Sequence, residues 1–321
     1  MDKKMTKCLM LTGAGARISQ EVALIDLLIE KKGFSISEDD TLLAGFSSGG
    51  LNLMAINGCF RNINPRSWET FYKEGTLWPL KTSDVYTPNH GKLPLYDTAP
   101  LRNTLNKFLR DIDVKTMGDL PFNSFVLTYS ERQFATKWAN NFLATNNQTL
   151  DASDLFMSSA SIPFVFGHQE INNLGEPRNF PKGKFNDGGT IGQFKRFGEH
   201  LGDYVLEHGA FETLHIISPM REAPAEPELS KLGHHQGLKE FEANMLFKAF
   251  YKFTVAMREW QEKNGPMANA VQVSIPRMDH NFPMHKFGDQ QAQYSRVMEW
   301  AEQHPEDFAV PLDEFVERHK P

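Results

Sequence analysis

The chain of 321 residues lacks the features that mark several large classes of protein. No apolar run approaches the roughly 18 residues that a membrane-spanning helix needs, so a transmembrane protein is not expected. The two cysteines, Cys8 and Cys59, have no Cys-x-x-Cys spacing, so the sequence predicts neither a disulfide scaffold nor a zinc site. A net charge of −6 gives no general electrostatic reason to bind nucleic acid.

The amino-terminal segment also lacks a recognisable export signal. Residues Met1 to Lys7 carry three lysines, but the apolar stretch from Cys8 to Thr12 is too short for the apolar region of a signal peptide. This stretch is better explained as a first strand. We therefore expect a cytoplasmic protein, while export by a route without a signal peptide stays open.

The patterns that are present indicate an α/β protein. Hydrophobic residues make up 40% of the chain and charged residues 23%, which is ordinary for a globular protein. Apolar runs at 5–12 and 42–44 each lead through small residues into an amphipathic helical pattern, the order of a parallel βαβ unit. The first helical pattern stops at Gly33, and a long helical pattern covers 237–262. Strand and helix patterns continue to about residue 303 without a linker or repeat. We predict one domain over residues 1–321, with an irregular, aromatic-rich insertion at about 61–120.

The most specific local motif is Gly45-Phe46-Ser47-Ser48-Gly49, which lies between a predicted strand and a predicted helix. A serine on such a turn projects its hydroxyl clear of the backbone, and its neighbours at −2 and +2 must be small because strand and helix nearly touch. The motif predicts Ser47 as a nucleophile supported by Gly45 and Gly49. The alternative is a glycine-rich turn with an incidental serine, since such a pattern arises by chance in roughly one chain in ten of this length.

A serine nucleophile needs a base. The predicted turn comes after a single βα unit, earlier than in an ordinary α/β-hydrolase, and no histidine is distinguished by its setting. Asp187 is distinguished, because it lies in Asn186-Asp187-Gly188-Gly189, where glycines let the backbone approach a neighbouring group. The alternative for this stretch is an ordinary Asp-Gly turn.

A third motif, Gly13-Ala14-Gly15-Ala16-Arg17, lies between the first predicted strand and the first predicted helix. Small residues at a helix N-terminus leave backbone N–H groups open to an anion. In an ester hydrolase this anion is the oxygen of the tetrahedral intermediate, and in a nucleotide enzyme it is a phosphate. A dinucleotide fingerprint fits less well, because Ile18 stands at the third glycine position and no ribose-binding acid follows the second strand.

Together and in this order, the three motifs resemble the patatin-like phospholipase family. Its pattern is Gly-Gly-Gly-x-[Arg/Lys]-Gly, then Gly-x-Ser-x-Gly, then Asp-Gly-[Gly/Ala]. The stretches 95–102 and 158–166 also look like family sequence, and the similarity extends from about residue 6 to 195. Two positions depart from the pattern, since Ala14 replaces the middle glycine and Ile18 the last. The resemblance implies a three-layer α/β/α fold with a mostly parallel central sheet.

The resemblance also implies an activity, that of a serine acylhydrolase cleaving acyl ester bonds of lipids, of phospholipase A or lysophospholipase type. Ser47 would attack the ester carbonyl, Asp187 would take its proton without a histidine, and water would release the fatty acid from an acyl-Ser47 intermediate. No cofactor and no metal are implied. The partner is the lipid ester itself, which a membrane surface can present.

Further roles follow from the same resemblance. The N–H groups of Gly13, Ala14 and Gly15 are expected to hold the oxyanion, and Gly188 supports the aspartate. Arg17 matches the basic residue of the family pattern, with a structural role and a lipid-phosphate contact both open for it. Two alternatives stay open. The first is a non-catalytic lipid- or partner-binding protein on the same fold, since a fold does not guarantee activity. The second is an NAD(P)-dependent oxidoreductase.

Overall fold

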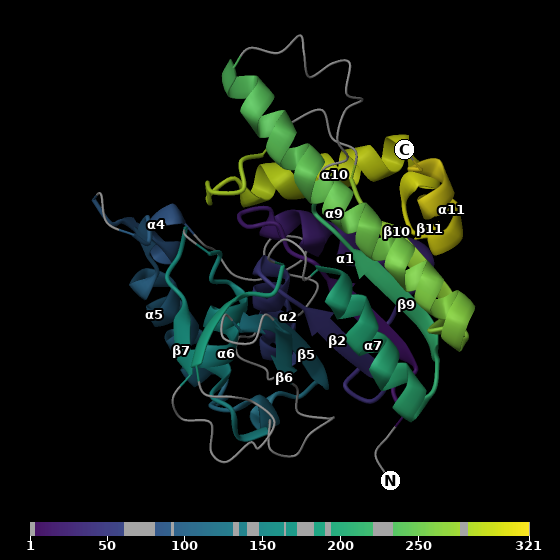
Figure 1. Ribbon diagram of the computed structural model, residues 1–321, viewed down its shortest axis with the longest axis horizontal. Helices are drawn as coiled ribbons and strands as arrows, with labels where there is room; N and C mark the ends of the chain where they lie inside the picture. Colours follow the sequence, from purple (N-terminus) through teal and green to yellow (C-terminus); the bar gives the residue numbers. More distant parts are fainter. Residues whose placement is uncertain are drawn as a thin grey trace.

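A computed structural model gives the fold of the chain (Figure 1). It describes residues 4–60, 81–90, 93–130, 135–139, 148–163, 165–171, 183–189, 194–220, 234–276 and 282–320. The first third of the predicted insertion, residues 61–80, therefore lies outside the described residues. The described part of it that follows contains helix α4 (Thr82–Val85), a short hairpin and helix α5 (Ala99–Asp111).

Strands and helices alternate along most of the chain. The strands are β1 (Lys7–Leu11), β2 (Thr41–Gly45), β3 (Thr87–Pro88), β4 (Tyr96–Asp97), β5 (Ser124–Ser130), β6 (Ala135–Ala139), β7 (Gln169–Ile171), β8 (Gly183–Asp187), β9 (Phe211–Ile217), β10 (Ala268–Ser274) and β11 (Val310–Pro311). The helices are α1 (Ile18–Lys32), α2 (Ser48–Phe60), α4 (Thr82–Val85), α5 (Ala99–Asp111), α6 (Ala152–Ser159), α7 (Phe194–His208), α9 (His234–Asn264), α10 (Gln290–Gln303) and α11 (Leu312–Arg318).

The described residues form one large sheet and one small hairpin, β3–β4. The large sheet has the order β11-β10-β9-β1-β2-β5-β8-β7, and β6 also pairs with β5. Strands β10, β9, β1, β2 and β5 run parallel to one another. At the margins, β11 is antiparallel to β10, β6 and β8 are antiparallel to β5, and β7 is antiparallel to β8. The predicted α/β class with a mostly parallel central sheet is confirmed.

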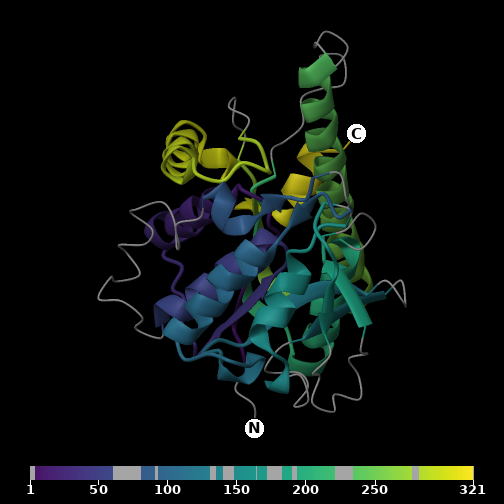
Figure 2. The same ribbon diagram turned by 90° about the vertical axis from the view of Figure 1, so that its left-hand side faces the viewer.

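Helices cover both faces of this sheet. Successive side chains of a strand point to opposite faces, so β1 places Leu9 and Leu11 in one hydrophobic core and Cys8 and Met10 in another. The first core packs under α1, α2, α5, α6 and α10, and the second under α7, α9 and α11. Figure 2 shows α1 and α10 on one side of the sheet and α9 on the other. This is the three-layer arrangement that was expected.

Several predicted boundaries agree with the structure. Helix α1 ends at Gly33, whose φ of 65° is left-handed and suits a residue without a side chain. The helical pattern predicted at 237–262 is part of α9. Helix α7 was not predicted. Within the described ranges, none of the helices is both long and apolar enough to cross a membrane.

Candidate active site

The turn between β2 and α2 carries Ser47. Its φ is 55°, in the left-handed region that residues with a side chain rarely adopt. Such strain, about 1 kcal/mol, collects at functional sites because the surrounding structure holds it. A Cβ on Gly49 would lie 2.4 Å from the Leu11 carbonyl oxygen, and one on Gly45 would lie 3.0 Å from the Gly49 oxygen. Gly49 is therefore required, and a side chain at Gly45 would be tightly packed, for the steric reason predicted.

Helix α6 holds this turn from the other side. The Ser47 N–H donates to the carbonyl oxygen of Ser159 at 3.1 Å and also lies 3.2 Å from its Oγ. The Ser159 hydroxyl in turn donates to the Leu127 carbonyl of β5 at 2.7 Å. The stretch that contains Ser159 was noted in the sequence as similar to the family, but no role was predicted for this residue. The structure shows that it anchors the turn to the sheet.

Strand register brings Asp187 to the same edge of the sheet as Ser47. Gly45 pairs with Val126 in the parallel β2–β5 ladder, and Thr128 pairs with Asp187 in the antiparallel β5–β8 ladder. Ser47 follows Gly45 by two residues, and Thr128 follows Val126 by two. The serine and the aspartate, 140 positions apart in the sequence, are thus placed at the same level beyond the end of β2.

The Asp187 carboxyl is buried, with 4% of the residue exposed. Burial raises its pKa from 3.8 to about 7, because the charged form loses its hydration. Hydrogen-bonding contacts from the Ser47 side chain and from the Gly189 N–H, 2.7 Å from Oδ1, oppose this rise. The Asp187 N–H donates to the Ser161 carbonyl oxygen at 2.9 Å, which fixes the residue to the end of α6.

The two glycines after Asp187 are required by close packing. A Cβ on Gly188 would lie 2.4 Å from the Leu127 carbonyl oxygen, and one on Gly189 would lie 2.6 Å from the ring of Phe46. The backbone after Asp187 therefore runs directly against β5 and against the residue that precedes Ser47. This agrees with the expectation that glycines let the backbone come close to a neighbouring group.

The glycine-rich loop differs from expectation. Gly13 and Gly15 have left-handed φ values of 67° and 57°, and Ala14 does not. The Gly13 N–H donates to the buried Glu21 Oε1 at 2.7 Å, and the Ala14 N–H donates to the Ser48 Oγ at 2.9 Å. These two N–H groups are therefore bound within the protein and not open to an anion as predicted. Among the described residues, the Gly15 N–H has no acceptor.

The side chains of Glu21 and Ser48 were missed as site residues. Ser48 was overlooked because it is the variable position of the Gly-x-Ser-x-Gly motif. Glu21 was missed because the burial of residues 18–28 of α1, which encloses this acid of the first turn, is seen only in the structure. A buried carboxyl needs polar partners, and the adjacent glycine loop supplies the nearest free N–H groups.

The first turn of α2 supplies further backbone donors beside Ser47. Ser48 is the first residue of the helix, and its N–H has no acceptor among the described residues. The N-terminus of a helix also carries partial positive charge. Near Ser47, the N–H groups of Gly15, Ser48 and Gly49 thus have no hydrogen-bond acceptor among the described residues.

Arg17 is buried and holds the loop in place. Its Nε donates to the Phe282 carbonyl oxygen at 2.9 Å, and its Nη1 lies 3.4 Å from the Pro219 oxygen. The sequence left a structural role and a lipid-phosphate contact open for this residue. The contacts in the structure support the structural role.

A segment near the carboxyl-terminal end, residues 282–287, crosses the glycine loop. The Ala16 N–H donates to the Met284 oxygen at 2.7 Å, and a Cβ on Gly15 would lie 2.4 Å from the same oxygen. A dinucleotide fingerprint uses its glycine to admit a pyrophosphate. Here the Gly13 N–H faces the Glu21 carboxyl, which would repel a phosphate, and the Met284 carbonyl oxygen lies on the side of Gly15 where a Cβ would point. Both contacts argue against the oxidoreductase alternative.

His215 has the surroundings of a core residue. It is buried in β9, and its ring centroid lies 4.8 Å from that of Phe34 in an edge-on arrangement. Burial lowers its pKa from 6.5 to about 4, so the ring is neutral at pH 7. It pairs with Leu9 in the middle of β1, before the strand reaches the glycine loop. The histidine is explained by packing.

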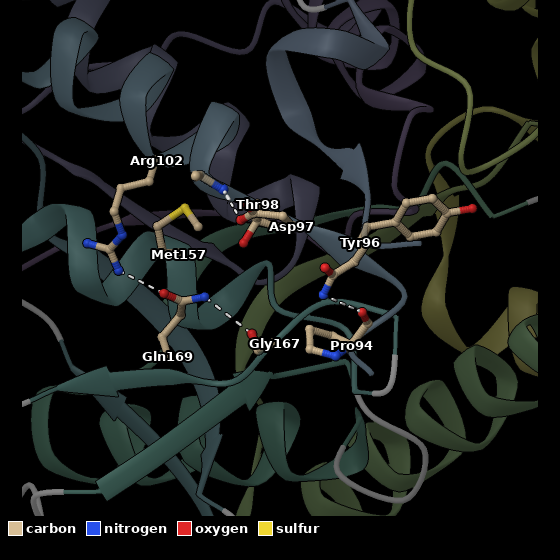
Figure 3. A pocket seen from close by; sticks show the side chains of 10 residues that line it. Pro94, Tyr96, Asp97, Thr98, Arg102, Met157, Gly167 and Gln169 are labelled. Atoms are coloured by element: carbon tan, nitrogen blue, oxygen red, sulfur yellow. Dashed lines mark hydrogen bonds between the residues drawn. The ribbon is translucent and has the colours of Figure 1, made fainter. Parts of the chain in front are cut away.

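A cavity of about 370 Å³ lies between the β3–β4 hairpin, α5, α6 and β7. Figure 3 shows Arg102 and Gln169 side by side in its wall. The Arg102 guanidinium is bound by Asp154 Oδ1 and by Gln169 Oε1, each at 2.7 Å. The Gln169 amide also lies 3.1 Å from Ser161 Oγ, which links this wall to the residue that binds the Asp187 N–H. Because Asp154 and Gln169 already bind the Arg102 guanidinium, the described lining of the cavity is polar but contains no unpaired cation.

Potential metal ligands come together at one place in the described part of the chain, formed by His304, Glu306 and Asp307. Asp307 Oδ1 already pairs with Arg318 Nη1 at 2.8 Å, and the other two residues are exposed. The three belong to one surface turn after α10. We therefore regard this group as part of the charged surface.

Comparisons with known proteins give little beyond this geometry. No family model matches the sequence, and no curated protein is significantly similar to it. Among solved structures, the crystal structure of VipD from Legionella pneumophila is similar over 93% of this chain and 67% of that chain, with 13% identity and a TM-score of 0.36. A similarity at this level carries no argument, so the site is interpreted from the contacts described above.

Proposed function

We propose that this chain is a serine acylhydrolase of the patatin-like type, in which Ser47 is the nucleophile and Asp187 is the base. The proposal is carried by one juxtaposition. A serine held with a left-handed backbone at a strand-to-helix turn contacts a buried carboxyl whose pKa is raised to about 7. A base works best when its pKa lies near the operating pH, because it can then both accept and return a proton.

The reaction would proceed in two half-reactions. The Ser47 oxygen forms a bond to the ester carbonyl carbon while its proton moves to the Asp187 carboxylate. The tetrahedral intermediate then expels the alcohol, which takes the proton from Asp187 and leaves an acyl-Ser47 ester. In the second half, water gives its proton to Asp187 and attacks the acyl carbon, and the fatty acid leaves as the proton returns to Ser47.

The negative oxygen of each intermediate needs donors. We assign the N–H groups of Gly15 and Ser48 to this task, with the N-terminus of α2 adding positive potential. Of the three donors expected from the sequence, this assignment retains Gly15. It gives Gly13 and Ala14 a structural role, because their N–H groups are bound by Glu21 and Ser48.

The surroundings of the dyad support an apolar acyl group as substrate. Phe46 packs edge-on against Phe197 with 5.4 Å between ring centroids, and Ala14 belongs to the same hydrophobic cluster. Met284, on the segment that crosses the loop, packs against this cluster and is only partly buried. Phe46, Phe197 and Ala14 are themselves buried, so an acyl chain would contact the exposed part of Met284, with a gain of about 0.8 kcal/mol for each methylene that is covered. We therefore propose lipid esters as the substrate class, cleaved by a phospholipase A or lysophospholipase activity.

The test is hydrolysis of a lipid panel by the wild type, Ser47→Ala and Asp187→Asn, with released fatty acids measured by mass spectrometry. We expect turnover in the wild type and a fall of roughly 10³-fold or more in both variants. Ser153→Ala is the matched control, because Ser153 is a buried serine of α6 whose hydroxyl has no partner among the described residues. Turnover that survives in Ser47→Ala would reject Ser47 as the nucleophile, and a wild type that hydrolyses no ester would reject the proposal in favour of a binding protein.

A further inference from the structure

Glu21 is a buried carboxyl at the base of the glycine loop that the proposed chemistry does not use. It lies on α1 and is fully inaccessible to solvent. Its Oε1 accepts a hydrogen bond from the Gly13 N–H at 2.7 Å, and its Oε2 accepts one from Nδ2 of Asn52, on α2, at 2.8 Å. Burying a carboxyl costs free energy, so the position of Glu21 in the interior needs an explanation.

These contacts connect three parts of the site. Glu21 joins α1 to the loop through Gly13 and to α2 through Asn52. Asn52 also donates to the Ile18 carbonyl at 3.0 Å, which fixes the beginning of α1 against α2. Helix α2 begins directly after Ser47. One carboxyl therefore sets the position of the loop relative to the helix that starts at the nucleophile.

The conformation of Gly13 explains why its N–H needs a side chain as its hydrogen-bond acceptor. Its φ of 67° is left-handed, and the position of a Cβ would fall 2.7 Å from the Gly49 nitrogen and 2.8 Å from the Phe46 oxygen. The loop is thus pressed onto the turn that carries Ser47. A buried N–H in such a place must have an acceptor, and α1 presents the Glu21 carboxyl to it.

We propose that Glu21 is a positioning residue for the oxyanion-binding loop: by clamping Gly13 and Asn52 it holds the Gly15 N–H in register with Ser47. The assignment rests on the proposed acylhydrolase function. Misplacing a catalytic group by about 1 Å costs roughly 10²-fold in rate, so the clamp has a measurable consequence.

The surrounding groups match the ionised form of Glu21. Both oxygens face N–H donors, from Gly13 and Asn52, and burial raises the pKa of the carboxyl to about 7. The other polar neighbours are accounted for. Arg17, one turn earlier, binds the carbonyls of 282 and 219, Gln293 of α10 binds the Ala16 carbonyl at 3.0 Å, and α2 carries no charged residue. Protonation of Glu21 would remove the negative charge that strengthens the hydrogen bond from Asn52.

The experiment compares Glu21→Leu and Glu21→Gln with Asp26→Asn. Leucine removes both contacts. Glutamine keeps an oxygen for the Gly13 N–H. Asp26 is a second buried acid of α1, bound by the Tyr294 hydroxyl and not by the loop, so its variant reports what losing any buried acid of this helix does. The readouts are kcat and KM on the best ester, hydrogen exchange of residues 13–17, and the pH profile.

For Glu21→Leu we expect kcat to fall roughly 100-fold with little change in KM, and exchange in the loop to speed up. Glu21→Gln should recover to within about tenfold of the wild type, as the loss of one neutral contact predicts. Asp26→Asn should change neither kcat nor the exchange of the loop. Below pH 7 the log rate should fall with a slope near one in Glu21→Gln, where only Asp187 loses charge, and more steeply in the wild type until Glu21 is protonated, by up to about tenfold more in all.

Unchanged loop exchange in Glu21→Leu would overturn the proposal whether or not an ester substrate is found, because the clamp itself would be absent. With an active wild type, wild-type kcat in Glu21→Leu, or the same slope in the wild type and Glu21→Gln, would overturn it as well. A wild type without Ser47-dependent turnover would instead reject the proposed function, and the exchange measurement would still decide on the clamp.

Discussion

The Ser47 turn and the glycine-rich loop lie against each other, yet they relate to their sequence motifs in different ways. At the turn, both motif glycines lie against backbone atoms that leave little or no room for a Cβ, as predicted. In the loop, the motif gives the backbone its left-handed glycines, but two of the three N–H groups have acceptors inside the protein. A motif thus specifies the path of the backbone. Which groups the backbone binds depends on side chains elsewhere, here Glu21 and Ser48.

The largest expected loss of stability comes from the turn. Gly49→Ala would place a Cβ 2.4 Å from the Leu11 carbonyl oxygen, and a backbone atom in a central strand cannot move away. We expect a loss of about 3 kcal/mol or failure to fold, measured by chemical unfolding. Gly50→Ala is the control, since its nearest contact would be an ordinary 3.5 Å. Equal stability of the two variants would contradict the packing described.

The loop can be tested in the same way. Gly15→Ala combines a left-handed φ of 57° with a Cβ 2.4 Å from the Met284 oxygen, whereas Gly33 has a φ of 65° and nothing within 4 Å. Gly33→Ala should therefore cost only the backbone strain of about 1 kcal/mol, and Gly15→Ala clearly more. If the two melting temperatures fell by the same amount, the segment 282–287 would not press on the loop.

The site acid should lower stability at neutral pH. The pKa of Asp187 is raised from 3.8 to about 7 by folding, so the folded state binds the proton more tightly and its stability decreases as pH rises between these values. The full effect is at most about 4 kcal/mol. Asp187→Asn should therefore be more stable than the wild type at pH 8, and the difference should shrink toward pH 4. A variant less stable at pH 8 would show that Asp187 stabilises the fold.

The smallest expected effect is at the anchor from α6. Ser159→Ala removes the hydroxyl that lies against the Ser47 N–H and binds the Leu127 carbonyl, but it keeps the backbone acceptor at 3.1 Å. We expect a loss of about 1 kcal/mol in the free energy of unfolding and a modest drop in the reactivity of Ser47. A loss of stability as large as that of Gly49→Ala would mean that the Ser159 hydroxyl, and not its backbone carbonyl, holds the Ser47 turn in place.

Local patterns were sufficient to predict the fold class, the Ser47 turn and the end of α1 at Gly33, because each depends on sequence-adjacent residues. The proximity of Asp187 to Ser47 came only from the resemblance, since it arises from the register of β2, β5 and β8. Glu21 could not be assigned because its partners, Gly13 and Asn52, follow no fixed spacing. Helix α7 was missed, although it lies directly after the aspartate motif.

The central claim is that Asp187 takes the proton of Ser47. The most direct measurement is the rate at which a fluorophosphonate labels Ser47 as pH varies, in the wild type and in Asp187→Asn, with the labelled peptide identified by mass spectrometry. We predict that the wild-type rate rises with pH to a plateau with a midpoint near 7, the pKa of the buried carboxyl, and that Asp187→Asn is labelled at least 10²-fold more slowly with no such rise. Equal labelling of the two proteins, or labelling of another serine, would contradict the account.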